Sequence, residues 1–289
     1  MTLNLSQVRA FLAVIDTGSF QEAARMLGCA QPTVTQLVRK LETDLAVQLV
    51  VRNRRGAVAT RGGAAFLPHA RRLLRAEQRA VASVTNSSLA IGASSNVGTY
   101  LLQPFLRRFA GISDTRPELV IATNPEIAER VEAGDVDIGV MEWWSDCPGF
   151  TAEVWHRERL VVIVPPDHIW ARDKAIPRDW LLEVTMLGGE AGSGTGRLLQ
   201  GVFGKKAERI RVSMSLGSTA AVKEAVKAGL GISLVFLSSV RDEVAAGSLC
   251  AVDLDGEPLE KELVVVMPED VPATAPAARF RSLLKEARA

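Results

Sequence analysis

The stretch SFQEAARMLGCAQPTVTQL, residues 19–37, decides the fold of the N-terminal part of the chain. It predicts a short helix over residues 19–27, a sharp turn at Gly28 and a second helix over about residues 31–43. Ser19, with a glutamate three positions on, has the spacing of a capping box at the start of the first of these helices. Two short helices joined by a tight turn that contains glycine are typical of a helix-turn-helix unit.

The inward positions of this unit carry the residue types that a helix-turn-helix needs. Ala24, Gly28 and Val34 meet the spacing of a small residue, a glycine four positions on and a branched aliphatic residue six further on. The other positions predicted to face inward are Ala23, Leu27, Cys29 and Leu37. Because a preceding helix has apolar residues from Leu5 to Ile15, a generic three-helix bundle also fits the spacing, and that alternative stays open here.

The outward face of the second helix of this unit favours DNA binding over a plain bundle. Thr33, Gln36 and Arg39 carry short or bidentate polar groups, which suit base edges and phosphates in a major groove. The residues of the unit that we predict to contact DNA are Ser19, Gln31, Thr33, Thr35, Gln36 and Arg39.

A hairpin is predicted directly after these helices. Residues 47–51 fit a strand, residues 52–56 fit a turn, and Val58 fits the start of a return strand. Such a hairpin is the wing of a winged helix-turn-helix, and arginines at its tip would lie where a phosphate backbone or minor groove passes. The arginines predicted to contact DNA from the wing are Arg52, Arg54 and Arg55.

These residues resemble the winged helix-turn-helix of LysR-type transcriptional regulators, without gaps over residues 3–75. The resemblance rests on Ser19-Phe20, Ala23-Ala24, Leu27, Gln31-Pro32, Val34-Thr35, Leu41-Glu42, Arg52 and Thr60. The chain departs from the family pattern at Ala30 and Thr35, where the family usually has Ser, at Val50-Val51 in place of Phe-Glu, and at Gly62-Gly63 in place of Ala-Gly. The change at Ala30 removes one hydroxyl contact, so it bears on base preference and leaves DNA binding itself expected.

The charge of the chain separates into two parts. The net charge of the 289 residues is only +1, but the first 85 residues hold 12 Lys and Arg against 5 Asp and Glu, a net of +7, and the remainder has a net of −6. Such asymmetry indicates a nucleic-acid-binding module joined to a module with another role. The length predicts about two domains, and three distant cysteines exclude a disulfide scaffold. With no membrane-length apolar run and no signal peptide, we expect a soluble cytoplasmic protein.

One long helix is predicted from Thr60, a candidate N-cap, to about Val84. It has an apolar stripe and an opposite face rich in arginine, and Pro68 near its start is expected to allow a kink. The resembled family dimerises through this element, so the resemblance implies a homodimer and, in the whole assembly, a homotetramer. Packing of the helix on the chain's own C-terminal domain remains the alternative.

From Ser87 onward, short apolar runs alternate with helices, which predicts α/β lobes with a mostly parallel sheet. The chain is expected to leave one lobe near Pro165-Pro166 and to return near Val264, which gives two lobes and a cleft. This layout resembles the periplasmic-binding-protein-like effector-binding domain of the same family, over residues 88–285. The predicted fold is therefore an α+β winged helix-turn-helix head, a long linker helix and an α/β two-lobed effector-binding domain. The predicted limits are 1–59 for the head, 60–86 for the linker helix and 87–289 for the effector-binding domain, with lobe I at about 87–164 and 265–289 and lobe II at about 165–264.

Four loops at the ends of predicted strands are candidates for an effector site. They are residues 94–98, 123–125, 192–195 and 217–219. They precede predicted helices and offer hydroxyls and backbone N–H groups, which suit a small anion such as a carboxylate, phosphate or sulfate. A plain helix cap is the alternative for any one of them. The stretch 189–195 resembles the family's Arg-Glu-Pro-Gly-Ser-Gly-Thr, but Gly189 stands in place of Arg, which weakens the case for a strongly charged ligand.

Two adjacent tryptophans, Trp143 and Trp144, follow a predicted strand near the expected cleft and suggest contact with an organic effector. The alternative is that one packs between the lobes while the other lies on the surface. Phe236 is expected to close the apolar side of the site. The residues predicted to bind the effector are Ser94, Ser95, Asn96, Thr123, Asn124, Trp143, Ser193, Gly194, Thr195, Ser218, Thr219 and Phe236.

Enzyme motifs are not found in the sequence. The three histidines have no carboxylate or serine at motif spacing, and the Gly-Ser-Gly-Thr stretch lacks the Lys-Ser/Thr of a phosphate loop. We therefore predict a transcription regulator without cofactor or metal, whose partners are double-stranded DNA, a small-molecule effector and copies of itself, with RNA polymerase as a further candidate and no membrane. The runner-up is a metabolite-binding module whose basic head binds another partner, such as a protein.

Overall fold

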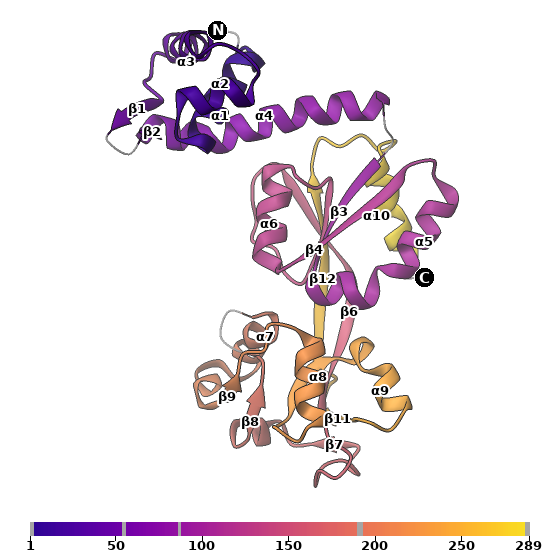
Figure 1. The fold of residues 1–289 in the computed structure, drawn as a ribbon. Helices are drawn as coiled ribbons and strands as arrows, with labels where there is room; N and C mark the ends of the chain where they lie inside the picture. Colours follow the sequence, from indigo (N-terminus) through magenta and orange to yellow (C-terminus); the bar gives the residue numbers. More distant parts are fainter. Residues whose placement is uncertain (1–2, 54–55, 86–87, 190–192, 287–289) are drawn as a thin grey trace. The chain divides into compact units, whose positions relative to one another are not determined.

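The computed structural model describes residues 3–53, 56–85, 88–189 and 193–286. Its chain divides into two compact units, one of Met1–Ser88 with Glu132–Asp135 and one of Leu89–Val131 with Val136–Ala289 (Figure 1). None of the helices within the described residues is both long and apolar enough to span a membrane. The predicted winged head, long helix and two-lobed α/β domain are confirmed.

The head begins with three helices, which are α1 (Leu5–Thr17), α2 (Phe20–Met26) and α3 (Gln31–Leu45). Gly18 and Gly28 adopt left-handed backbone conformations, with φ of 66° and 64°, and so end one helix and turn the chain toward the next. Val34 is fully buried and Ala24 nearly so. The helix-turn-helix spacing therefore builds the core of this unit, as predicted.

Two details of the helix-turn-helix differ from the prediction. Cys29, expected to face inward, is exposed, because it lies in the turn between α2 and α3. The capping box is only half formed. The Ser19 hydroxyl accepts hydrogen bonds from the N–H groups of Gln21 and Glu22, whereas the Glu22 carboxylate pairs with Arg25 at 2.6 Å.

The wing consists of β1 (Val50–Asn53) and β2 (Gly56–Ala59), paired antiparallel. The predicted limits, a strand over 47–51 and a turn from Arg52, were wrong by about three residues. The cause is the Glu42 carboxylate on α3, which accepts hydrogen bonds from the N–H groups of Leu49 and Val50 at 2.8 and 3.0 Å. The strand therefore starts at the second of the two residues that this carboxylate anchors, Val50.

The long helix α4 (Arg61–Thr85) starts after Thr60, whose hydroxyl accepts a hydrogen bond from the Gly63 N–H at 3.0 Å. The predicted N-cap is thus confirmed. The apolar stripe of its first half packs on α1, where the rings of Phe66 and Phe11 lie 5.5 Å apart, and Pro68 lies within the helix on its exposed side.

In the second unit, the first lobe has helices on both faces of its strands. The strands are β3 (Ser88–Ser94), β4 (Arg116–Ala122), β5 (Ile138–Met141), the first part of β6 (Phe150–Val164) and β12 (Glu260–Pro268). Helices α5 (Gln103–Ile112) and α10 (Pro276–Glu286) cover one face through Phe109 and Phe280, which pack edge to face. Helix α6 (Asn124–Ala133) covers the other face through Ile127 and Val131. A π-helix, η1 (Val97–Leu101), follows β3.

The second lobe is built around the last part of β6, residues 160–164. The other strands are β7 (Ala175–Ile176), β8 (Thr185–Leu187), β9 (Arg211–Met214), β10 (Ser233–Phe236) and β11 (Cys250–Leu254). The helices are η2 (Arg178–Leu182), α7 (Gly194–Phe203), η3 (Gly204–Arg209), α8 (Thr219–Lys227), η4 (Leu237–Ser239) and α9 (Arg241–Ala245). Val161 and Ile163 of β6 face α8, and their neighbours Leu160 and Val162 face the opposite core, so this part of β6 is buried on both sides.

The expectation of a mostly parallel sheet was wrong. The main sheet has the order β4-β3-β5-β12-β6-β11-β7, with β10 also paired to β6. β12 pairs antiparallel with β5 and β6, and both β10 and β11 pair antiparallel with β6. Among the described residues, β3 pairs parallel with β5, β11 with β7, and β8 with β9. The two strands that pass between the lobes, β6 and β12, are antiparallel. They have to be, because the chain leaves the first lobe along one and returns along the other.

The crossing between the lobes lies within strands. Residues 150–159 of β6 pair with β12, and residues 160–164 pair with β10 and β11 of the second lobe. Figure 1 shows β6 and β12 as the two strands that connect the lobes. The expected crossings near Pro165 and Val264 therefore come about five residues too late, because β6 continues through the point where its partners change.

Glu158 lies on β6 near the point where the strand changes partners. Its hydrogen bonds predict how the stability of the protein depends on pH. Its carboxylate is buried, accepts a hydrogen bond from the Ser238 N–H at 2.9 Å and lies 2.9 Å from His156 Nε2. Burial alone would raise the pKa of Glu158, but the hydrogen bonds from His156 and Ser238 outweigh it and hold the pKa below its usual value. The ionised Glu158 carboxylate therefore stabilises the fold at pH values above the pKa of an unfolded glutamate, about 4.3. This stabilisation is lost as the pH falls through the lower pKa of Glu158 in the folded protein.

We expect Glu158→Gln to lower the free energy of unfolding by about 1–3 kcal/mol at pH 7, and we expect this difference to shrink below about pH 4. Urea unfolding of both proteins across pH would measure it. Glu262→Gln is the control, because Glu262 pairs with Arg157 on the surface and its loss should change stability by no more than about 0.5 kcal/mol. A Glu158 effect that is equally large at pH 3 would contradict the argument.

Candidate functional site

The side chains of α3 that were predicted to contact DNA lie wholly or partly at its surface. Gln31, Thr33, Gln36 and Arg39 are exposed. Thr35 is partly buried, and its hydroxyl donates to the Gln31 carbonyl at 3.1 Å, so that hydroxyl is already used within the helix. α3 therefore presents amide, hydroxyl and guanidinium groups together, which are the groups that read base edges and phosphates.

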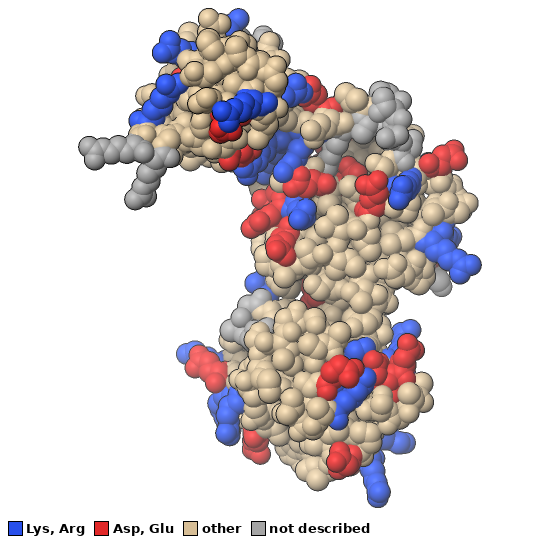
Figure 2. Space-filling view, in the orientation of Figure 1, with Lys and Arg blue, Asp and Glu red and all other residues tan. Residues whose placement is uncertain are grey.

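The wing and the cap of α2 supply the other predicted DNA contacts. Arg52 is exposed on β1, and its guanidinium lies 4.3 Å from the ring centre of Phe20, which holds the side chain against α2. Ser19 caps α2, so its hydroxyl already binds the helix N–H groups. Arg54 and Arg55 lie outside the described residues. In Figure 2 the visible face of the head carries several lysine and arginine patches and little acidic surface.

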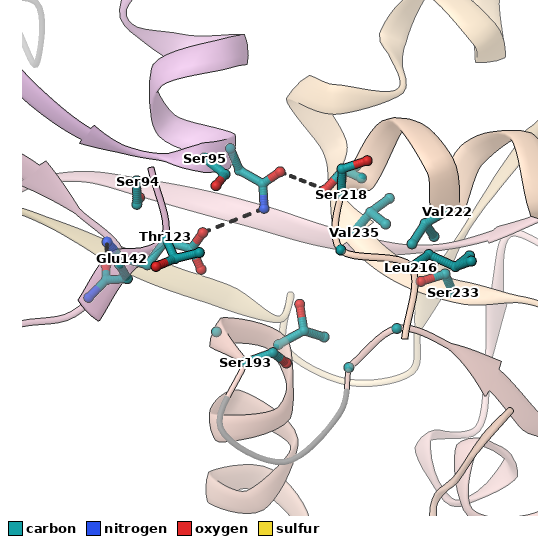
Figure 3. A pocket seen from close by; sticks show the side chains of 18 of the residues that line it. Ser94, Ser95, Thr123, Glu142, Ser193, Leu216, Ser218, Val222, Ser233 and Val235 are labelled. Carbon is teal, nitrogen blue, oxygen red and sulfur yellow. Dashed lines mark hydrogen bonds between the residues drawn. The ribbon is translucent and has the colours of Figure 1, made fainter. Parts of the chain in front are cut away.

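A cavity of about 440 Å³ lies between the two lobes of the second unit. The residues that line it are Ser94, Ser95, Asn96, Thr123, Asn124, Pro125, Glu142, Trp143, Gly188, Gly189, Ser193, Gly194, Thr195, Leu216, Gly217, Ser218, Thr219, Val222, Ser233, Leu234 and Val235. Figure 3 shows the labelled hydroxyl residues of the first lobe facing those of the second. The structure thus brings together eleven of the twelve predicted effector-binding residues, all twelve of which are described.

Phe236 is the predicted residue that the structure places elsewhere. It is 2% exposed at the end of β10, and Lys261 Nζ lies 5.4 Å from its ring centre. The apolar wall is formed instead by Leu216, Val222 and Leu234, with Val235 beside them. The sequence did not predict this apolar wall, because apolar residues in β10 and α8 look the same whether they line a cavity or fill a core.

Two of the candidate loops cap helices as well as forming parts of the cavity wall, and a third is tied to the helix that follows it. Ser193 caps α7 by accepting from the Gly196 N–H at 3.0 Å, and Ser218 caps α8 by accepting from the Ala221 N–H at 3.2 Å. Thr123 donates to the Glu126 carboxylate at the start of α6. A cap uses one of the four N–H groups that the first turn of a helix leaves without an intrahelical partner, so the others can still donate to an anion.

The serines after β3 differ from each other in their hydrogen bonding. Ser95 Oγ donates to the Ala122 carbonyl at 3.1 Å. Ser94 is 1% exposed, and its Oγ has no hydrogen-bond partner among the described residues. A buried hydroxyl without a partner costs free energy, so Ser94 is a natural contact for a ligand in this cavity.

A buried ion pair that sequence reasoning missed lies at the cavity wall, where Glu142 is one of the lining residues. Lys261 Nζ donates to Glu142 Oε2 at 2.6 Å, and the two side chains are only 8% and 9% exposed. Burial lowers the pKa of Lys261, and the Glu142 carboxylate opposes that shift. Glu142 follows β5 at the strand end where ligand groups are expected, but Lys261 has no local signal, because its partner lies 119 residues away.

Asn124 and the two tryptophans shape the first-lobe rim. The Asn124 amide accepts from the Glu142 N–H at 2.8 Å and donates to the Trp143 carbonyl at 2.9 Å, which fixes the chain beyond β5. The ring of Trp143 faces the Arg197 guanidinium of α7 at 5.0 Å. Trp144 packs on Phe150 within the first lobe. The tryptophans therefore divide the roles, with Trp143 at the cavity and Trp144 in the packing of its own lobe.

Two family models match the chain. One is described as the LysR substrate binding domain and matches residues 82–289, and the other is described as a bacterial regulatory helix-turn-helix protein of the lysR family and matches residues 5–64.

The chain is also similar to curated proteins and solved structures. A putative HTH-type transcriptional regulator protein PtxE of Stutzerimonas stutzeri is 47% identical over 195 residues, which cover 67% of this chain and 100% of that protein. The RuBisCO operon transcriptional regulator of Allochromatium vinosum is 30% identical, over 98% of this chain and 96% of its own length. A full-length OxyR variant from Pseudomonas aeruginosa has the same fold, with a TM-score of 0.72 at 19% identity over 99% of this chain and 95% of that one.

Proposed function

The chain belongs to the LysR family of transcriptional regulators, and we propose that a small anionic or polar metabolite, bound in the cavity between its two lobes, changes how its winged head acts on DNA. The cavity carries this proposal. It combines a buried, unpartnered Ser94 hydroxyl with the first turns of three helices, an arrangement that favours an anionic or polar ligand. The effector can shift the equilibrium between two conformations of the protein only if it binds one of them more tightly than the other.

We also propose which residues contact DNA and effector, where the domains end and how the protein assembles. We assign DNA contacts to the surface of α3, to Ser19 and to the wing, and effector contacts to the residues that line the cavity. We propose the division into head, linker helix and effector-binding domain with the predicted limits, except that the lobes meet at residues 159–160, where β6 changes partners. The amphipathic α4 is the proposed dimer contact, two dimers form the proposed tetramer, and RNA polymerase is a proposed partner at the promoter.

We further propose that the protein has no catalytic activity and acts in the cytoplasm, where its DNA lies. The relatives at 47% and 30% identity are both named as regulators. In the described part of the chain, no three His, Cys, Asp or Glu side chains come together as metal ligands would. A small molecule that binds the purified protein should therefore be recovered unchanged.

Two substitutions on the head test the DNA-binding assignment. Arg52→Ala should weaken binding to all sequences alike and lower the slope of log affinity against log salt by about 0.9, as expected for one lost phosphate contact. Gln36→Ala should cost about 1–3 kcal/mol at particular bases only, because an amide reads a base edge. Gel-shift titrations at several salt concentrations, with a randomised DNA library, measure both effects.

Arg108→Ala is the matched control for the loss of one positive charge. Arg108 is exposed in the second unit and pairs with Glu286, so its loss should leave both the salt slope and the base preference unchanged. If Arg52→Ala and Gln36→Ala behave alike across the library, the assignment of α3 as the recognition helix is wrong. If binding of the unaltered protein is weak and blind to sequence at every salt concentration, the head has another partner.

A further inference from the structure

The side chain of Asn96 connects the two lobes across the cavity. Thr219 Oγ1, at the start of α8, donates to Asn96 Oδ1 at 2.6 Å, and Asn96 Nδ2 donates to Glu142 Oε1 at 3.5 Å (Figure 3). One side of this space therefore accepts hydrogen bonds and the other donates them. A ligand group that enters between Glu142 and Thr219 has to offer both a donor and an acceptor.

Glu142 is a fixed acceptor in this space. Its Oε2 is held by Lys261 Nζ at 2.6 Å, which leaves Oε1 on the side that Asn96 reaches. The backbone of Gly194 covers the pair so closely that a Cβ at that position would lie 2.0 Å from Glu142 Oε2. The carboxylate therefore has no room to turn away from a ligand that faces it.

The surroundings of Glu142 favour a negatively charged ligand. The first residues of α6, α7 and α8 line the cavity, and these helices have 10, 10 and 9 residues. The N-termini of α7 and α8 carry partial positive charge and N–H groups, whereas the Thr123 N–H and hydroxyl at the start of α6 already donate to the Glu126 carboxylate. The unpartnered Ser94 hydroxyl lies in the same wall. The site thus combines groups that attract an anion with one carboxylate that repels every anion except one that still carries a proton.

We propose that the effector presents a protonated oxyanion of the phosphate type, free or as a small monoester, whose hydroxyl donates to Glu142 Oε1 and whose other oxygens accept from Ser94 and the helix N-termini. This inference rests on the proposed function and names the ligand class of the same site. A phosphoryl group keeps a proton for part of the time near neutral pH, since its second pKa is about 6. Sulfate has the same shape and no such proton, so it sets a charged oxygen against Glu142.

The size of the cavity accommodates both forms of the ligand. Its volume of about 440 Å³ exceeds what an inorganic oxyanion fills, and Leu216, Val222 and Leu234 line the side away from Glu142. A short organic substituent on a phosphate monoester can lie along that apolar wall. A monoester that binds more tightly than free phosphate would identify the wall as part of the ligand site.

The test is direct binding to the full chain by isothermal titration calorimetry, with inorganic phosphate, glycerol 3-phosphate and sulfate at matched ionic strength. Thermal shifts alone do not suffice, because sulfate and phosphate both stabilise proteins through exclusion from the surface. We expect phosphate or its monoester to bind at least about tenfold more tightly than sulfate, a difference of one well-placed charged hydrogen bond. Equal affinity for sulfate, or no binding of either phosphate compound, would overturn the proposal.

Glu142→Gln tests the residue itself. The amide removes the negative charge, so we expect the preference for phosphate over sulfate to fall by about tenfold. Because a lone Lys261 can prevent folding, the double variant Glu142→Gln/Lys261→Met provides the same test without an unpaired buried charge. Glu158→Gln is the control, a buried carboxylate of the same unit that does not line the cavity, and it should keep the preference. A Glu142→Gln protein that keeps the full preference overturns the assignment.

Failure of this inference is distinguishable from failure of the proposed function. If neither phosphate compound binds, but another small molecule changes the DNA binding of the full chain, the ligand class is wrong and the regulatory function stands. If phosphate binds with the expected preference and the protein ignores DNA, the ligand class stands and the regulatory function is wrong.

Discussion

Replacing Gly63 with alanine should abolish DNA binding by unfolding the winged head. A Cβ at this position would lie 2.0 Å from the Leu49 carbonyl oxygen and 3.0 Å from its carbon, both of which are backbone atoms. The Gly63 N–H also donates to Thr60 at the start of α4, so the helix cannot shift without losing its cap. We expect the free energy of unfolding of the head to fall by about 3 kcal/mol or more, measured by urea unfolding together with gel shifts.

The neighbouring glycine provides the control. A Cβ on Gly62 would lie 2.5 Å from a methyl carbon of Val47, a side chain that is 45% exposed, and 3.3 Å from the backbone oxygen of Gln48. Gly62→Ala should therefore change stability by less than about 1 kcal/mol and leave DNA binding in place. Equal losses in the two variants would show that crowding against the backbone at Leu49 is not the cause.

Replacing Gly194 with alanine should disrupt the cavity while leaving the head intact. The new Cβ would lie 2.0 Å from Glu142 Oε2 and 2.6 Å from Lys261 Nζ, which are held together in a buried pair. Either the pair separates or the start of α7 moves away from the first lobe. A disrupted buried pair costs about 3–5 kcal/mol, so unfolding of the second unit should shift by an amount of that order. DNA binding in the absence of effector should persist, measured by gel shift.

Gly201 lies on the same helix and is the matched control. A Cβ there meets no atom within 4 Å, so Gly201→Ala should keep the cavity and stabilise α7 by up to about 1 kcal/mol. If both Gly194→Ala and Gly201→Ala destabilise the protein, the cause lies in the backbone of α7. Destabilisation by Gly194→Ala alone would attribute it to the ion pair.

The sequence predicts those parts of the fold that depend on neighbouring residues. Ser19, Gly28 and Val34 act within about 16 positions of each other, so the helix-turn-helix follows from local spacing. The start of β1 does not, since it depends on the Glu42 carboxylate seven residues before Leu49. The first part of β6 is hard to predict for a different reason. Residues 150–159 mix charged and aromatic side chains, and the strand is held by its long antiparallel pairing with β12.

The candidate site shows the same division. Loops that open helices are visible in the sequence through Ser193, Ser218 and Thr123, because caps are local. The structure adds the contacts that cross the chain. Lys261 and Asn96 reach partners 119 and 123 residues away, and no spacing rule connects such positions. The polar lining could therefore be predicted, whereas the pairing of Glu142 with Lys261 could not.

The passage of β6 through both lobes has a consequence for how the second unit unfolds. The strand supplies Leu160, Val162 and Val164 to one continuous core that also contains Ile91 and Val140 of the first lobe. Unfolding of either lobe would expose part of this core in the other, so we expect the two lobes to unfold in a single cooperative transition. Free energy gained from a ligand in the cavity is distributed over the whole unit by mass action. We therefore expect a ligand in the cavity to slow the solvent exchange of amides in β3 as well as in α8, which hydrogen-exchange measurements with and without ligand would test.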